Sequence, residues 1–159
     1  MLRVARRLGA SLPLQVKSTL LAAHALPEEF KNDRDGYIRL IIDELVPAVA
    51  AEGLADFIDV FCETNYFTVA EMERVLEAGA RHGLKGKVHV NQFTSFGAIQ
   101  AAVQHGALSV DHLEVMEEAD LRVLAGAKTL PTLLASCSFF LRIPYAPARQ
   151  MISKGLPLA

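Results

Sequence analysis

Apolar residues recur along this chain in two alternating patterns, one with a period of two residues or continuous, the other with a helical period. The first pattern predicts strands at Leu14 to Ala22, Ala55 to Cys62, Lys87 to Asn91, Leu108 to Asp111 and Thr129 to Leu134. The second predicts helices over residues 35–53, 68–83, 95–106 and 117–126, each of which ends in glycine. Residues 1–9 are typical of the last turns of a helix that ends at Gly9.

Two of these helices carry further local signals. The apolar face of the helix over 35–53 is formed by Ile38, Ile41, Leu45 and Val49. Pro47 lies inside this helix and predicts a kink, because proline has no N–H to donate to the preceding turn. The helix over 68–83 begins with Thr68 and Glu71, the spacing of a capping box.

Strands that alternate with helices predict an α/β fold with parallel strands and right-handed crossovers. Both an open doubly wound sheet and part of a (β/α)8 TIM barrel satisfy this alternation. Because every predicted strand has a polar or ionisable group at or just after its carboxyl end, we favour the barrel, in which all strands deliver residues to one mouth. A barrel needs eight strands and about 250 residues. We therefore expect residues 1–159 to be one unit, an incomplete barrel with about five strands from inside a larger protein.

Composition narrows the class of protein. Hydrophobic residues make up 52% of the chain, which is ample for a packed core. The net charge of -2 and the isoelectric point near 6.2 argue against a nucleic-acid partner. No apolar run approaches the roughly 18 residues of a membrane span, and no signal peptide is recognisable, so we expect a cytoplasmic protein. Cys62 and Cys137 fit no metal or redox spacing and are expected to be free thiols.

Two histidines near neighbouring strand ends are the main candidates for chemistry. His89 alternates with Val88 and Val90, so its side chain should face the barrel interior if the valines pack on the helices. An imidazole there is a natural ligand for zinc or iron, although a hydrogen-bonded core histidine would show the same pattern. His112 lies 23 residues further along the chain, at the end of the next strand. Convergence of the two side chains would favour a metal site or acid–base chemistry.

Three further residues are candidates for the same mouth. His24 follows the first strand directly and suits a substrate contact, or alternatively a cap on loop backbone. Glu63 ends a buried strand, so its carboxylate either faces the mouth or caps the next loop. Gln92 lies three residues after His89, and its amide can bind a ligand but cannot move a proton at neutral pH.

These residues lie in segments that resemble one enzyme family. The ordered set AHALP, DVFCE, HVNQF and DHLE, together with the flanking residues, closely resembles the imidazolonepropionases of the amidohydrolase superfamily from end to end. The resemblance implies a (β/α)8 barrel that uses one divalent metal, zinc or iron, and water to open the cyclic amide of 4-imidazolone-5-propanoate. The product is N-formimidoyl-L-glutamate, an intermediate of histidine degradation. A homodimer is one assembly that we consider for the complete protein, with neither nucleic acid nor membrane as a partner.

The resemblance also implies a role for each candidate. His89 matches the family's strand-five metal ligand, His24 and Gln92 match its substrate contacts, and His112 matches the active-site histidine of strand six. Glu63 matches the FCE element, and we count it with His112 as a candidate catalytic residue. Many relatives carry glutamate where this chain has Gln92, which shifts the acid–base role towards His112.

The family's other metal-binding motifs, a His-x-His on strand one and an aspartate on strand eight, do not occur in these residues. We therefore assign the activity to a parent protein and expect the chain to be inactive alone. The alternatives are another cyclic-amide hydrolase or aminohydrolase of the same superfamily, or a non-catalytic α/β binding or assembly module. A flavodoxin-like binding module would need a phosphate-binding loop, and no such motif is present.

Overall fold

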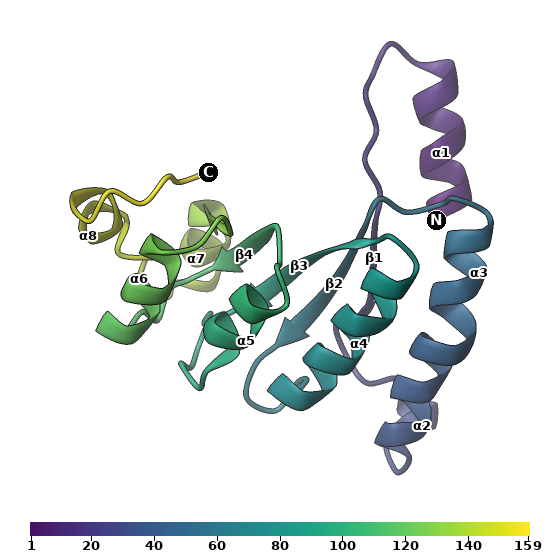
Figure 1. The fold of residues 1–159 in the computed structure, drawn as a ribbon, viewed down its shortest axis with the longest axis horizontal. Coiled ribbons are helices and arrows are strands. Elements are labelled where there is room, and N and C mark those ends of the chain that lie inside the picture. The colour runs from purple at the N-terminus through teal and green to yellow at the C-terminus, as the bar shows by residue number, and fades with distance from the viewer.

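The computed structural model describes residues 1–159 and contains one sheet of five parallel strands (Figure 1). The strands are β1 (Thr19–Ala23), β2 (Phe57–Cys62), β3 (Lys85–Val90), β4 (Ser109–His112) and β5 (Leu130–Leu133). They are paired in chain order, as expected when each strand is followed by a right-handed crossover to its neighbour. The five predicted strands and their parallel arrangement are confirmed. The first strand is shorter than predicted, because residues 14–18 lie outside the sheet.

Helical segments lie between successive strands and at both ends of the chain (Figure 1). They are α1 (Leu2–Ser11), the 3-10 turn η1 (Glu28–Phe30), α2 (Arg34–Arg39), the π-helical η2 (Leu40–Leu45), α3 (Val46–Ala51), α4 (Val69–Arg81), α5 (Ala98–Gln104), α6 (Glu118–Ala125), α7 (Ala135–Leu141) and α8 (Ala148–Ser153). The sequence pattern did not predict α7 and α8. None of the helices has the length and apolar character required to cross a lipid bilayer.

The strand pleat separates an apolar face from a polar one. Ile58, Val60, Val88, Val90 and Val110 are at most 1% exposed and belong to the hydrophobic core beneath the helices. Alternate residues of the same strands lie on the opposite face, where a barrel has its interior. Those positions include Asp59, His89 and Asp111. The period-two pattern therefore decides which side chains can meet inside the barrel.

A π turn alters the long helix that the sequence predicts over 35–53. In η2, the N–H of Val46 bonds to the carbonyl of Ile41, five residues earlier, directly before Pro47. Pro47 cannot donate an N–H, and the helix accommodates it just after the wider turn. The extra residue shifts the buried face, so Val46 is fully buried while Leu45 is only partly buried. Leu45 still packs against the core, as predicted, and the other three residues of the predicted face are buried.

The structure at the two ends of the chain goes beyond what the sequence predicts. The first helix continues through Gly9 to Ser11, and none of its residues is buried. It projects beyond the sheet (Figure 1), and its Arg3 forms an exposed ion pair with Glu52 after α3. At the other end, Ala159 donates to the carbonyl of Pro131 and accepts from the N–H of Leu133. These two bonds satisfy part of the outer edge of β5.

The contact between α4 and β2 is testable at Gly79. A Cβ built on Gly79 would lie 2.5 Å from Cγ2 of Ile58, so this helix can approach the strand only without a side chain at that position. We expect Gly79→Ala to lower the free energy of unfolding by about 1–3 kcal/mol through overpacking. This loss should exceed the gain of about 1 kcal/mol in helix propensity. Chemical denaturation of the purified protein measures the difference.

Gly126→Ala is the matched control. A Cβ on Gly126 would meet no atom closer than 3.8 Å, and this glycine does not adopt the left-handed conformation. Its substitution should leave stability within about 0.5 kcal/mol of the parent. Equal stability of the two variants would contradict the close approach of α4 to β2.

Candidate active site and metal centre at the strand ends

Three of the predicted imidazole side chains gather around Phe61 at the carboxyl ends of the strands. The ring of His24 stacks on Phe61 with their centroids 5.2 Å apart, and its centroid is 6.4 Å from that of His89. The rings of His89 and His112 have centroids 5.3 Å apart. His24 follows β1 and is exposed, whereas His112 at the end of β4 is buried. Residues separated by up to 88 positions in the chain thus form one cluster, because parallel strands bring their carboxyl ends together.

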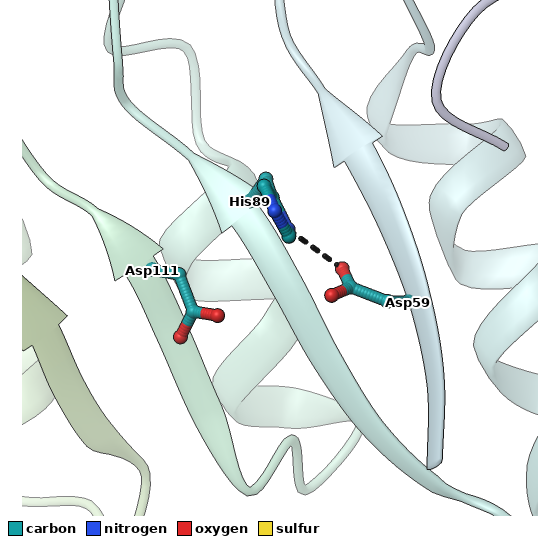
Figure 2. Close-up of side chains that lie close together, drawn as sticks. All are labelled: Asp59, His89 and Asp111. Carbon is teal, nitrogen blue, oxygen red and sulfur yellow. Dashed lines mark hydrogen bonds and ion pairs between the residues drawn. The ribbon is translucent and has the colours of Figure 1, made fainter. Parts of the chain in front are cut away.

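A carboxylate from the neighbouring strand orients His89. Nδ1 of His89 lies 3.0 Å from Oδ1 of Asp59, whose side chain is buried on β2 (Figure 2). If Nδ1 carries the proton and donates to Asp59, the lone pair of Nε2 is free for a ligand. Burial alone would lower the pKa of His89, but the bond to Asp59 and the charges of Asp59 and Asp111 outweigh it and raise the pKa.

Asp111 completes a group of three potential metal ligands. One ligand atom from each of Asp59, His89 and Asp111 lies within 4.8 Å of the others (Figure 2). Oδ1 of Asp111 is buried without a hydrogen-bond partner, and its other oxygen lies 3.7 Å from Nζ of Lys87. Buried carboxylate oxygens are normally paired, and two carboxylates beside an imidazole form a donor set that suits a divalent cation. The residues present therefore fit a metal, although Asp59 already holds Nδ1 of His89.

His112 reaches the cluster through an unusual backbone. The strand register pairs His89 with Asp111, and it pairs His112 with Val90, a residue of the apolar face. Regular pleating would therefore direct His112 towards the helices. Instead, His112 and Leu113 have positive φ values of 87° and 68°, in the left-handed region. This local conformation breaks the alternation, and the His112 ring lies near Phe61 and His89.

Glu63 makes a different set of contacts from the histidines. Its carboxylate accepts hydrogen bonds from the backbone N–H groups of Thr64 and Phe93 at 2.7 and 2.8 Å, and from the N–H of Thr94 at 3.3 Å. The Thr94 hydroxyl also donates to it. Glu63 is only 2% exposed. Its side chain therefore joins the end of β2 to the loop after β3, the loop that carries Gln92.

Gln92 is buried at the start of that loop, where its Nε2 lies 3.5 Å from Sγ of Cys137 on α7. Both cysteines are free thiols, as predicted. Burial raises the pKa of Cys62 to about 12, so its thiolate is not available at neutral pH. A second buried carboxylate, Asp120 on α6, supports the same loop by accepting from Ser95 at 3.1 Å and from Asn91 at 3.2 Å.

Three residues near the site, Asp59, Asp111 and Glu114, are not among the candidates that the sequence indicates. Asp59 was recognisable as a carboxylate within an otherwise apolar strand, an arrangement that is costly without a partner. Asp111 is the last residue of the fourth predicted strand, but only the strand register places it beside His89. Glu114 follows the strand by two residues, and its contact with His112 depends on the left-handed turn between them.

The chain is similar in sequence to known bacterial proteins. The chain is 55% identical over all 159 residues to an imidazolonepropionase of Flavobacterium psychrophilum, and it spans 39% of that protein. It is 47% identical over 160 aligned positions to an imidazolonepropionase of Myxococcus xanthus, of which it spans 38%. The chain thus corresponds to less than half the length of these curated relatives. No family model matches it.

Solved structures with the same fold have little sequence similarity to the chain. An adenine deaminase from Arthrobacter aurescens aligns with a TM-score of 0.73 and 14% identity, over 99% of this chain and 47% of the enzyme. A guanine deaminase from C. acetobutylicum aligns with a TM-score of 0.69 and 9% identity, over 100% of this chain and 43% of the enzyme. An adenosine deaminase from Xanthomonas campestris with bound zinc has a TM-score of 0.65 at 14% identity. The fold is part of a (β/α)8 barrel, as the sequence predicted.

The contacts of Glu63 predict a measurable effect on the loop after β3. Glu63→Gln keeps the size of the side chain but replaces an ionised acceptor with an amide that must also place two donors near backbone N–H groups. We expect faster amide hydrogen exchange at Phe93 and Thr94 and a loss of about 1–3 kcal/mol in the free energy of unfolding. Glu77→Gln, on the exposed face of α4, is the control. Unchanged exchange at Phe93 and Thr94 would show that Glu63 does not fix this loop.

Proposed function

Over its whole length this chain is homologous to the imidazolonepropionases, and we propose that it forms part of the catalytic barrel of such an enzyme. The proposed reaction is the hydrolysis of the cyclic amide of 4-imidazolone-5-propanoate to N-formimidoyl-L-glutamate. The observation that carries this proposal is the 55% identity, without a break, to proteins of that name. The cluster of His24, His89 and His112 at the strand ends supports a hydrolytic site at the same place.

We assign the metal-binding role to His89. The Asp59 contact at Nδ1 leaves Nε2 free as a ligand atom. Asp111 belongs to the same group of potential ligands and has one buried oxygen without a hydrogen-bond partner. A divalent cation held there supplies Lewis acidity, which polarises the amide carbonyl and makes water more acidic. The structural relatives include enzymes crystallised with zinc. Both zinc and iron suit a site with an imidazole and carboxylates.

His112 and Gln92 are assigned complementary roles. His112 is the imidazole best placed for proton transfer, because His89 is committed to Asp59 and Gln92 cannot titrate at neutral pH. In this role His112 takes a proton from the attacking water or donates one to the ring nitrogen that leaves. Gln92 offers an amide donor and acceptor to the substrate from the loop after β3.

His24 and Glu63 complete the assignment. His24 is exposed beside Phe61 and can donate a hydrogen bond to the carboxylate or the ring of an incoming substrate. For Glu63 we propose a role in positioning, because both carboxylate oxygens are engaged by residues 64, 93 and 94. Glu63 then acts on the reaction by holding the loop that carries Gln92.

A second candidate is an aminohydrolase that acts on a different nitrogen heterocycle. The structural relatives named adenine deaminase and guanine deaminase support it, since they share the fold of this chain. Their identities of 14% and 9% to this chain are far below the 55% of the imidazolonepropionase. Parallel assays of a full-length protein carrying this segment separate the two reactions, because ring opening of the imidazolone and release of ammonia from a purine are monitored independently.

The ligand assignment predicts different effects for His89 and Gln92 in such a full-length protein. His89→Ala removes a ligand atom and should reduce both the bound metal and kcat, by about tenfold or more. Gln92→Ala should leave the metal content unchanged and raise KM. His82→Ala, at the exposed end of α4, is the control for loss of an imidazole. Metal analysis of the purified variants decides the assignment, and an undiminished metal content in His89→Ala would refute it.

We also expect the 159-residue chain, expressed by itself, to neither retain a metal nor open the imidazolone ring. Its sequence contains five histidines but no His-x-His pair, and two of the three clustered residues, Asp59 and His89, already bond to each other. Dialysis after exposure to zinc or iron, followed by metal analysis and by the absorbance of imidazolonepropanoate, measures both properties. Turnover comparable to that of the full-length protein would show that the catalytic residues are misassigned.

A further inference from the structure

A chain of buried polar side chains runs from α7 to His112. The hydroxyl of Ser138 donates to Oε1 of Glu114 at 2.7 Å. The other carboxylate oxygen of Glu114, Oε2, faces Nδ1 of His112 at a distance of 3.6 Å. Both side chains of this pair are nearly inaccessible, with 6% of His112 and 2% of Glu114 exposed. Ser138 and Glu114, from two neighbouring βα units, thus form a series of contacts that ends at the imidazole of His112.

The two facing atoms have no other partner. Nδ1 of His112 and Oε2 of Glu114 are both buried, and neither forms a hydrogen bond within normal distance. Leaving a buried polar atom unpaired is costly, so we expect a donor nitrogen and an acceptor oxygen that face each other to pair. An ionised glutamate can only accept, which assigns the proton to Nδ1 of His112. A shortening of about half an ångström would bring the pair to ordinary hydrogen-bond distance.

The backbone around His112 supports a positional function. His112 and Leu113 both adopt left-handed φ values, a conformation that is strained for residues other than glycine. It persists because Leu113 is completely buried and its N–H bonds to the carbonyl of Val90 at 3.3 Å. The same turn brings Oε2 of Glu114 to 3.6 Å from Nδ1 of His112. The strained conformation therefore sets the contact between His112 and Glu114 as well as the position of the ring.

We propose that Glu114 is a positioning residue for His112: it accepts the Nδ1 proton, is itself held by Ser138, and leaves Nε2 of His112 free to exchange protons with the substrate. This inference rests on the proposed function of His112 and adds a tautomer and a supporting pair to it. A neutral imidazole has one donor and one acceptor nitrogen, so fixing the proton on Nδ1 makes Nε2 the basic atom.

The ionisation of Glu114 agrees with this arrangement. Burial by itself would raise the pKa of Glu114, but the contacts with His112 and Ser138 outweigh burial and leave that pKa below its ordinary value. Glu114 is thus an acceptor at neutral pH. Asp59 and His89 form a similar pair on the adjacent strands, but there Nδ1 is held at 3.0 Å and Nε2 is assigned to the metal. Both imidazoles then have Nε2 free, which in His89 is assigned to the metal and in His112 to proton exchange with the substrate.

The test uses a full-length protein carrying this segment, with histidine labelled at its ring nitrogens by nitrogen-15. Long-range proton–nitrogen spectra at neutral pH report which nitrogen of His112 carries hydrogen, and His112→Gln identifies its signals. We expect a proton on Nδ1 of His112 in the parent protein. A proton on Nε2 with Nδ1 unprotonated would overturn the proposal, without the need for any further variant.

Glu114→Gln then tests the effect on catalysis. It keeps the shape of the side chain but removes the charged acceptor, and we expect loss of the preference for Nδ1 and a fall in kcat of about 10- to 100-fold with little change in KM. Ser138→Ala should produce the same changes to a smaller extent, and Glu77→Gln should produce neither. An unchanged His112 tautomer in Glu114→Gln would contradict the inference.

The two readouts separate this inference from the proposed function. If the parent protein does not hydrolyse the imidazolone but the His112 tautomer depends on Glu114, only the proposed function fails. If the protein hydrolyses the imidazolone and the tautomer is independent of Glu114, only the positioning role fails.

Discussion

The in-register pairing of parallel strands is the constraint on which the rest of this structure depends. Adjacent strands advance in the same direction, so residues at their carboxyl ends meet at one edge of the sheet. The pleat then sends alternate residues to opposite faces. On one face this alternation builds the apolar core beneath the helices, and on the other it places Asp59, His89 and Asp111 together. Core and candidate site are two consequences of the same pairing.

Placing ionisable groups on a buried face requires partners for them. Lone buried carboxylates would be costly, and here each has a distinct solution. Asp59 binds His89, Glu63 accepts from the loop after β3, and Glu114 lies between Ser138 and His112. Asp111 keeps one oxygen without a partner, which is the observation most consistent with a ligand that is not part of the polypeptide. Asp59 and Glu63 thus bind other residues, whereas Asp111 has an oxygen that is free to bind a ligand.

The loops at the strand ends are positioned by side chains from neighbouring units. Glu63 after β2 fixes backbone groups after β3, while Asp120 on α6 binds Asn91 and Ser95 from the same loop. Charged acceptors hold backbone N–H groups more firmly than neutral ones do. A loop that is tied from both sides presents Gln92 in a defined place. The rigidity of the mouth thus comes from contacts between consecutive βα units as much as from the strands themselves.

The sequence by itself determined the alternation of strands and helices, the parallel sheet and the capping box at Thr68 and Glu71, because periodicity and capping are local properties. It also indicated His24, His89 and His112, since a strand end is recognisable from the chain alone. Only the tertiary structure decided the π turn before Pro47, which buries Val46 completely while Leu45 is only partly buried. It likewise decided that His112 leaves its pleat direction through a left-handed backbone and that Asp111, not His112, is in register with His89. These features depend on contacts between residues on different strands, and no local pattern in the sequence encodes those distances.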